Sequence, residues 1–339
     1  MENHMETATH VDAAPPGIAE LIREARENPA KPVIQNLVHE HEIVGLHGPP
    51  EVFKTILTLQ LAESLATGKP FLGVWRVPRP QTVYFFETEM SVVSLGGRLS
   101  RMFAGQAPPE KVIFADEKRL KKFKRAGNLA AKFALLNEWV QQAAADVVIV
   151  DTCNPFFRGK ESANDETTAG AFFDHLEALP APTKLFVRHN HKPRVEDAGA
   201  DAAARIRGSG QFADVPDLLL EMRRTDKRIQ QGELSITKFR HGGRPDNVTL
   251  WFDTGTFRLI SLPPVIQVLQ RGPLSRGELL EQLERRFGIS QRLADDMIND
   301  QRQFLQEYQQ GHQRMFEIDR DAAVNAAEWL PRAIAEGLL

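Results

Sequence analysis

Short runs of β-branched and aromatic residues alternate with stretches whose apolar positions recur at helical spacing. The clearest run, Val147–Val150, is apolar throughout, as in a parallel strand that is buried on both faces. Strands and helices in alternation predict an α/β domain with a mostly parallel central sheet. The five strands predicted in this part are Glu42–His47, Thr82–Glu87, Lys111–Phe114, Asp146–Asp151 and Lys184–His189.

The pattern changes after the fifth strand. Pieces separated by turn residues predict antiparallel strands at Leu218–Arg223, Glu233–Phe239, Val248–Phe252 and Thr256–Ile260. The pair Pro263 and Pro264 marks a domain boundary. Beyond it we expect helices at Val265–Gln270, Arg276–Phe287 and Gln291–Glu307, a strand at Arg314–Ile318 and a last helix at Ala322–Glu336. The predicted domains are an N-terminal arm (1–32), an α/β domain (33–262), a small C-terminal domain (264–319) and a C-terminal helix (320–339).

The strongest chemical signal follows the first strand and precedes a helical pattern. It consists of Gly48, Pro49, Pro50, Glu51, Val52, Phe53, Lys54, Thr55 and Ile56. In a phosphate-binding loop, backbone N–H groups cradle the phosphates, Lys54 adds a positive charge, and Thr55 offers a hydroxyl to magnesium. Phe53 stands where a glycine usually precedes the lysine, so its side chain must point away from the nucleotide or distort the loop. The motif predicts ATP and Mg²⁺ as cofactors; a chance match in a strand-to-helix turn is the alternative.

Carboxylates end two of the predicted strands. Asp151 ends the apolar strand that begins at Asp146, where it would hold magnesium beside the phosphate loop. Glu87 and Glu89 follow Phe86 on the same side of an extended segment, and either could orient the water that attacks ATP. The alternatives are a turn capped by Asp151 and a solvated acidic strand exit.

Four segments give the chain a specific resemblance. They are Glu89-Met90-Ser91 with Arg98 and Leu99, Lys238-Phe239-Arg240-His241-Gly242 leading into Val248–Phe252, Phe257-Arg258-Leu259, and Val187–Lys192 followed by Arg207-Gly208-Ser209-Gly210. Together they resemble the RecA-like core of DnaB-type and RepA-type replicative helicases, which are P-loop ATPases, and the last resembles the RepA-like branch. The resemblance covers roughly two-thirds of the chain, from Val33 to Leu262.

The resemblance implies roles for individual residues. Glu89 matches the catalytic glutamate, and His189 matches the residue that senses the γ-phosphate. Lys238 and Arg240 match the basic pair that enters a neighbouring subunit's site, and Arg207 is a second candidate for that finger. A cation supplied in trans would couple hydrolysis to a ring-shaped homo-oligomer, which the resemblance implies is a hexamer. A solvated strand edge is the alternative for the basic pair.

A basic cluster in the core is a candidate for nucleic-acid contact. Its cations are Lys118, Arg119, Lys121, Lys122, Lys124 and Arg125. They could neutralise several phosphates while Phe123 stacks on a base, although a solvated helix face explains them equally well. Further candidates come from a stretch that corresponds to channel-lining loops in ring motors of this resemblance: Lys192, Arg194 and Arg205.

The C-terminal domain resembles a winged helix, but its charge argues against DNA binding. Residues Pro264–Asp319 carry seven arginines against nine aspartates and glutamates, and the expected recognition helix contains Asp295, Asp296 and Asp300. Because such a face repels phosphates, we expect it to contact protein.

The composition of the chain mainly excludes certain partners and kinds of site. The 339 residues carry 42 basic and 45 acidic side chains, a net charge of −3, so no global basic field indicates a nucleic-acid partner. The single cysteine excludes a disulfide framework and a multi-thiolate zinc site. With no signal peptide or apolar span of membrane length in the sequence, we expect a cytoplasmic protein without a membrane partner.

These observations lead to one hypothesis and one alternative. The hypothesis is an ATP-hydrolysing ring motor on single-stranded DNA, a RepA-like replicative helicase of a plasmid, phage or mobile element, with a primase or initiator protein as a candidate partner. The alternative is an ATP-switched DNA-binding adaptor or regulator without unwinding activity, which would not need Glu89 and a basic finger.

Overall fold

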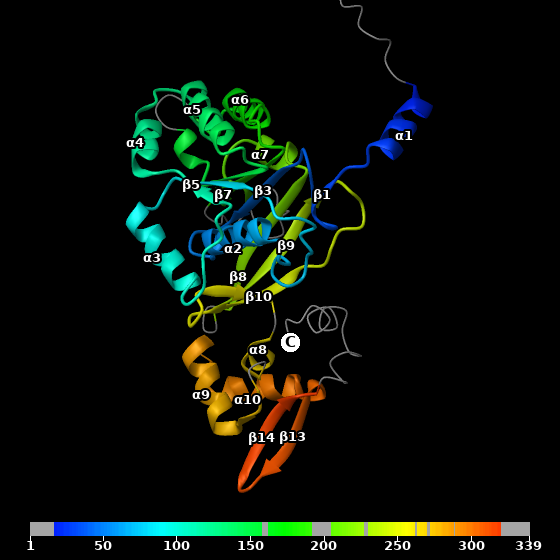
Figure 1. Ribbon diagram of the computed structural model, residues 1–339, viewed down its shortest axis with the longest axis vertical. Coiled ribbons are helices and arrows are strands. Elements are labelled where there is room, and N and C mark those ends of the chain that lie inside the picture. The colour runs from blue at the N-terminus through cyan, green and yellow to red at the C-terminus, as the bar shows by residue number, and fades with distance from the viewer. Residues whose placement is uncertain are drawn as a thin grey trace, which may run out of the picture. The chain divides into compact units, whose positions relative to one another are not determined.

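A nine-stranded sheet is the centre of the fold (Figure 1). The computed structural model describes residues 17–157, 162–191, 205–226, 230–261, 263–269, 272–287 and 289–319. The strand order in the sheet is β11-β10-β9-β8-β3-β7-β6-β4-β5. The strands are β3 (Ile43–Gly48), β4 (Val83–Glu87), β5 (Val112–Phe114), β6 (Val147–Asp151), β7 (Thr183–His189), β8 (Leu218–Asp226), β9 (Gln231–Phe239), β10 (Val248–Asp253) and β11 (Arg258–Ile260).

The first five predicted strands are confirmed, as β3 to β7, with ends that differ by no more than one residue. They pair in parallel, as their apolar sequences predict. Their carboxyl ends therefore meet at one edge of the sheet, which is where ligands bind in open α/β sheets.

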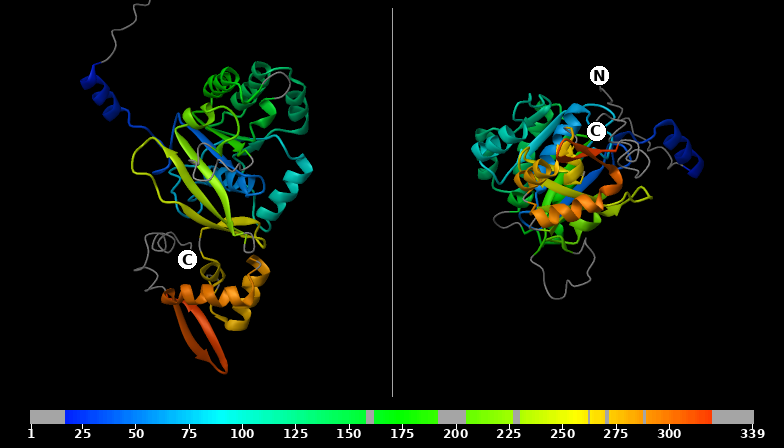
Figure 2. Two further views of the ribbon diagram at one scale, coloured as in Figure 1. Left: turned by 180° about the vertical axis from the view of Figure 1, so that it is seen from behind. Right: turned by 90° about the horizontal axis from the view of Figure 1, so that it is seen from below.

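The prediction for β8 is wrong in one respect. This strand was expected to be antiparallel, but it pairs in parallel with β3 and antiparallel with β9. Its first half, Leu218–Leu220, is apolar and buried like the other parallel strands. The remaining strands β9, β10 and β11 are antiparallel, as predicted; the strands of this part are visible from behind in Figure 2, in light green and yellow.

Alternate residues of the parallel strands supply two separate cores. Val44 and Leu46 point to the side covered by α2 (Lys54–Thr67) and α3 (Val92–Met102). Phe86 and Phe186 point to the opposite side, which α4 (Glu117–Arg125), α5 (Leu129–Gln142), α6 (Glu166–Glu177) and α7 (Gln211–Asp214) cover. The sheet is thus enclosed by helices on both faces, as the α/β prediction requires.

Most of these helices begin at a residue that caps them. The side chains of Ser91, Asp116, Asn128 and Asp165 each accept a hydrogen bond from the backbone N–H three residues later. Such caps satisfy donors that the first helical turn leaves free. The helix after the phosphate loop, α2, has no such cap, because the loop itself occupies its N-terminus.

The C-terminal elements are α8 (Pro264–Leu269), β12 (Leu274–Ser275), α9 (Arg276–Phe287), α10 (Gln291–Asp300), the 3₁₀ turn η4 (Arg302–Phe304), β13 (Leu305–Gln310) and β14 (Gln313–Ile318), with strand order β12-β14-β13. The predicted helix over Gln291–Glu307 is wrong at its end, since α10 stops at Asp300 and β13 begins at Leu305. Glutamine and glutamate favour helices in isolation, but pairing with β14 determines the conformation here. The winged-helix assignment stays a prediction, and the expected helix at Ala322–Glu336 lies outside the described residues.

The chain divides into two compact units, Met1–Lys31 and Pro32–Leu339. The described part of the first contains α1 (Ile18–Glu27). The second begins with the short antiparallel strands β1 (Pro32–Ile34) and β2 (Val38–His39), and a 3₁₀ turn, η1 (Asn154–Phe156), follows β6. None of the helices in the described ranges is long and apolar enough to cross a membrane.

Candidate functional site: the phosphate loop and its surroundings

The phosphate loop connects β3 to α2. Gly48 is required here by close packing, because a Cβ at this position would lie 2.2 Å from the carbonyl oxygen of Met222 in β8. The ammonium of Lys54 donates hydrogen bonds to the carbonyl oxygens of Gly48 (3.0 Å) and Pro49 (2.5 Å). Burial lowers the pKa of Lys54 to about 8, against the opposing effect of Asp151. This lysine therefore carries a charge that water barely solvates.

Phe53 takes a left-handed backbone conformation, with φ of 67°. That explains why a glycine is usual at this position. Its ring stacks on Phe252 of β10 at a centroid distance of 4.7 Å, and the guanidinium of Arg224 lies 5.3 Å from it. The side chain thus points into the core on the β10 side, away from the loop, as its position in the motif required.

Two carboxylates are buried side by side at the ends of β4 and β6. Glu87 and Asp151 are register partners, and both are almost fully buried. Asp151 accepts a hydrogen bond from the Thr58 hydroxyl at 3.0 Å and also interacts with the hydroxyl of Thr55. Burial raises the pKa of both carboxyl groups, that of Glu87 to about 7. One Glu87 oxygen accepts the N–H groups of the following turn, whereas Oε2 has no partner among the described residues.

This donor set fits a magnesium ion. Hard divalent cations prefer oxygen ligands, and the Thr55 hydroxyl and the Asp151 carboxylate supply them at the helix N-terminus. A nearby dication would offset the charge that burial makes unfavourable on Asp151 and Glu87. Thr55 and Asp151 stay the predicted magnesium ligands, and their chemistry fits that ion.

Glu89 is partly exposed and contacts side chains that follow β6 and end β7. Its Oε1 atom accepts hydrogen bonds from the Thr152 hydroxyl (2.7 Å) and from the Asn154 amide (3.5 Å), and it lies 3.5 Å from Nε2 of His189. The hydrogen bond with His189 lowers the pKa of Glu89 to about 2. Of the two glutamates left open by the sequence, Glu87 is engaged by backbone N–H groups of its own turn, whereas Glu89 is an ionised, partly exposed side chain between β6 and β7.

His189 ends β7, beside Gly48 in β3. Its carbonyl oxygen accepts a hydrogen bond from the backbone N–H of Arg207. His189 therefore links the phosphate loop, which begins beside it, to the segment that follows position 204. The side chain of Arg207 is exposed close to this strand end. The guanidinium of Arg188 also holds this segment: it donates to the Arg207 carbonyl oxygen at 2.6 Å and to the sulfur of Cys153 at 3.3 Å.

Lys238 and Arg240 lie at the other edge of the sheet. Lys238 pairs with Leu219, beside the start of β3, whereas the phosphate loop follows its end. The Arg240 guanidinium binds Asp217 Oδ1 at 2.8 Å, and Lys238 donates to the carbonyl oxygens of Ala213 and Asp214. Neither side chain therefore reaches the phosphate loop of its own chain.

The basic cluster forms the exposed face of α4. Three of its cations pair with carboxylates: Arg119 with Asp116, Lys121 with Glu117, and Lys122 more loosely with Glu138. Lys118, Lys124 and Arg125 are exposed on the same helix. The idea that Phe123 stacks on a base is wrong: its ring is 1% exposed and packs edge-on against Phe86 and Phe156.

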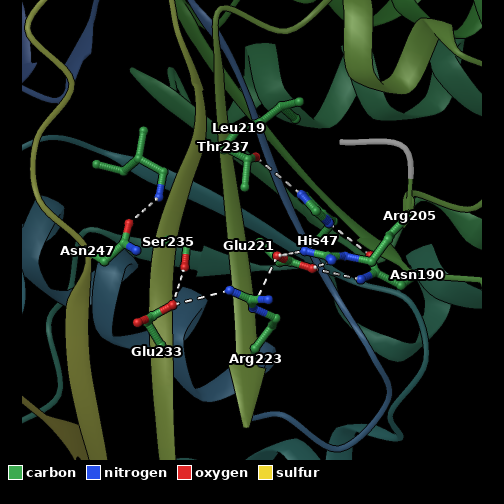
Figure 3. A network of polar contacts seen from close by, with 11 residues as sticks. His47, Asn190, Arg205, Leu219, Glu221, Arg223, Glu233, Ser235, Thr237 and Asn247 are labelled. Atoms are coloured by element: carbon green, nitrogen blue, oxygen red, sulfur yellow. Dashed lines mark hydrogen bonds and ion pairs between the residues drawn. The ribbon is translucent and has the colours of Figure 1, made fainter. Parts of the chain in front are cut away.

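Arg205 takes part in a buried polar network rather than presenting an isolated charge (Figure 3). Its guanidinium makes two hydrogen bonds to Glu221, which is fully buried, at 3.1 and 2.7 Å. The same carboxylate accepts from the amide of Asn190 at 3.1 Å and lies 3.3 Å from Arg223. The two neighbouring candidates, Lys192 and Arg194, lie outside the described residues.

Sequence reasoning missed the residues that position the predicted ones. Thr152 follows Asp151 directly and Asn154 stands three positions after it, so polar residues just after a buried strand could have predicted them. Thr58 lies one helical turn after Lys54 and faces the same way, so helical spacing could also have predicted its place in the site. Glu221 gave no such signal, because Asn190 and Arg205, two of its three partners, lie on other segments of the chain.

The family follows from comparison with known proteins. The sequence pattern described as "AAA domain" matches residues 15–198, which is more than half of the chain. The chain belongs to the AAA domain family. A search of curated proteins finds no match.

Solved structures place the fold of this AAA domain. A KaiC-like protein, PH0186 from Pyrococcus horikoshii OT3, matches with a TM-score of 0.50 and 13% identity over 68% of this chain and 94% of that one. The RadB recombinase (TM-score 0.45, 16% identity, 66% and 91% covered) and a further solved ATPase domain (0.46, 13%, 66% and 85%) also match. At these identities the likeness concerns the fold alone. The core is a RecA-like P-loop ATPase fold, as predicted.

Proposed function

We propose that this protein hydrolyses ATP with Mg²⁺ and uses the energy to move on single-stranded DNA as a ring-forming motor, a RepA-like replicative helicase. The observation that supports it best is the placement of Glu89. Thr152, Asn154 and His189 hold its carboxylate beside the phosphate loop. A protein that only binds ATP as a switch has no need for an ionised carboxylate held in this way.

Each residue of the site would then have its own role in ATP hydrolysis. The loop N–H groups and Lys54 would bind the phosphates, and Thr55 and Asp151 would hold the magnesium ion, which neutralises charge on the β- and γ-phosphate oxygens. Glu89 would orient the attacking water as a hydrogen-bond acceptor. Its pKa of about 2 makes it a weak base, so orientation is its main contribution. His189 contacts Glu89 and would report the loss of the γ-phosphate to the segment bonded to its carbonyl group.

Completion of the site would require a neighbouring subunit. Lys238 and Arg240 lie too far from the phosphate loop of their own chain, so any action on ATP must occur in trans. Mixing Arg240→Ala subunits with Lys54→Ala subunits tests this, because a mixed ring joins an intact site to an intact finger. Partial recovery of ATPase activity is expected, and absence of recovery would count against the finger. Arg207, exposed beside His189, is the second residue to test in the same way.

DNA contact is assigned to the exposed cations of α4. The candidate residues are Lys121, Lys122, Lys124 and Arg125. Arg205 contributes less, because Glu221 already neutralises it. Replacing Lys124 and Arg125 by glutamine should weaken single-stranded DNA binding and flatten its salt dependence, since each lost phosphate contact reduces the slope.

The deciding experiment measures ATP hydrolysis with and without single-stranded DNA, followed by strand displacement on a forked duplex. Glu89→Gln should retain ATP binding and lose hydrolysis by about 100-fold or more, the usual effect of removing a catalytic carboxylate. Stimulation by DNA together with unwinding supports the helicase. If Glu89→Gln hydrolyses ATP like the wild type, the proposed mechanism is wrong.

The second candidate is an ATP-switched adaptor or regulator. The acidic C-terminal elements favour it, because nine carboxylates against seven arginines suit a protein partner, such as a primase or an initiator, better than DNA. Stimulation of the ATPase by DNA without any strand displacement would favour this function.

A further inference from the structure

A cluster of two imidazoles and one carboxylate lies away from the phosphate loop. His39 comes from β2, Glu42 from the turn before β3, and His241 from the segment just after β9. One ligand atom from each lies within 4.8 Å of the other two. Because Glu42 precedes β3 and the phosphate loop follows it, the cluster belongs to the opposite edge of the sheet.

The glutamate is held with one oxygen directed at the histidines. Its Oε2 atom accepts the backbone N–H of His39 at 3.0 Å. Its Oε1 atom lies 3.2 Å from Nδ1 of His39 and in contact with Nε2 of His241. A carboxylate whose second oxygen is held by a backbone N–H is arranged as a metal ligand with outer-sphere support.

Backbone hydrogen bonds hold the turn that carries Glu42, and a ring contact positions His241. The turn before β3 is bonded to the start of β7, because the N–H of His41 donates to the Pro182 carbonyl oxygen and the Glu42 carbonyl oxygen accepts from the Lys184 N–H. His241 packs edge-on against Phe239, with ring centroids 5.3 Å apart. The cluster is therefore preorganised by its scaffold rather than by chance contact of mobile side chains.

The buried carboxylate of Glu42 favours the binding of a cation at this site. The Glu42 side chain is only 8% exposed, and a buried carboxylate needs compensation. Two imidazole nitrogens and one carboxylate oxygen are the three protein ligands of a common type of zinc site, whereas Mg²⁺ and Ca²⁺ prefer oxygen alone. Metal–ligand bonds of about 2.1 Å place tetrahedral ligands about 3.4 Å apart, which small side-chain rotations can reach from here. His241, with 35% of its side chain exposed, leaves a side open for a water as fourth ligand.

We propose that His39, Glu42 and His241 bind one Zn²⁺-class divalent transition-metal ion. The ion would join the β1–β2 segment and the turn before β3 to the end of β9. This site is independent of ATP and of the magnesium ligands.

The test uses untagged full-length protein, freed of metal with a chelator and without nucleotide. Titration with Co²⁺ should give the visible absorption of a tetrahedral site, saturating at a single ion per chain, and Zn²⁺ should displace it. Zn²⁺ should also raise the melting temperature, because it binds the folded chain. Absence of a tetrahedral Co²⁺ spectrum in the wild type would overturn the proposal.

Single histidine substitutions test where the ion binds. His39→Gln and His241→Gln should each abolish the Co²⁺ spectrum and the thermal shift; His241 is partly exposed, so its replacement should leave folding intact, as circular dichroism would show. Two histidine controls should retain both signals. His41→Asn removes the neighbouring imidazole while suiting the positive φ of 70° at that position, and His189→Asn removes the imidazole beside the phosphate loop. A spectrum that survives His39→Gln and His241→Gln but disappears in His189→Asn would place the ion at the ATP site and refute the assignment.

Discussion

The imidazole of His47 and the amide of Asn190 are hydrogen-bonded at 2.8 Å, Nδ1 to Oδ1, next to the start of the phosphate loop. The Asn190 amide nitrogen donates to Glu221, so its oxygen is the acceptor and His47 carries a proton on Nδ1. Burial lowers the pKa of His47, which keeps the ring neutral. Asn190 therefore links His47, in the strand that leads to the phosphate loop, to the buried carboxylate of Glu221.

Glu221→Gln should strongly destabilise the fold. The change keeps the size of the side chain but removes the charge that binds Arg205 and Arg223. Because both arginines are partly exposed, the loss is that of hydrogen bonds to a charged group, about 1.5 to 3 kcal/mol. Urea unfolding measures the effect. Glu233→Gln is the matched control, because Glu233 also binds Arg223 but is partly exposed, and it should cost about 1 kcal/mol or less. Equal losses in the two variants would contradict a special role for Glu221.

ATP binding should take up a proton above pH 8. Free Lys54 has a pKa of about 8, and contact with phosphate stabilises its charged form, so the complex binds more protons than the free protein at higher pH. Apparent ATP affinity should be steady below pH 8 and fall by up to about tenfold per pH unit above it. Calorimetry in two buffers of different ionisation enthalpy counts the proton. Lys54→Arg stays charged, so its binding should show no uptake over this range.

Thr152→Val should slow hydrolysis without weakening ATP binding. The substitution removes the hydroxyl that binds Glu89 at 2.7 Å while preserving the shape of a buried side chain. Hydrogen bonds to charged groups contribute about 1.5 to 3 kcal/mol, so kcat should fall by about tenfold or more with KM for ATP unchanged. Thr58→Val provides a contrast, since it frees Asp151 and should raise the Mg²⁺ concentration needed for activity. A rise in KM for ATP in Thr152→Val would argue that Thr152 contacts the nucleotide instead.

Phe53→Gly should be more stable than Phe53→Ala. Both variants lose the stacking on Phe252, but only glycine accepts a φ of 67° without strain, a difference of about 1 kcal/mol. The order is reversed in an ordinary helix, so Val93→Ala should be more stable than Val93→Gly in α3 by a similar amount. Denaturant unfolding of the four variants checks both orders. If alanine is the more stable residue at position 53 as well, backbone conformation does not control this site.

The sequence predicted the parts of the site that depend on local pattern. Lys54, Thr55, Asp151 and Glu89 all stand at the end of a strand or the start of a helix, and parallel pairing brings such ends together. The contact between His47 and Asn190 could not be inferred, because these residues are 143 positions apart and their contact depends on which strands are neighbours. The first three residues of β13, Leu305–Glu307, were mistaken for the end of a helix because long-range pairing overrides the local preference of Gln306 and Glu307.

Cys153 offers a practical use. It is the only cysteine of the 339 residues and is fully buried, and burial raises the pKa of its thiol despite the nearby Arg188. Because reactivity requires an accessible thiolate, the wild-type chain should resist maleimide labelling while it is folded. A cysteine introduced at Val93, which is 85% exposed in α3 shortly after Glu89, would therefore accept a fluorophore at one defined position. Movement next to Glu89 could then be followed by fluorescence in a protein that keeps every native residue but one.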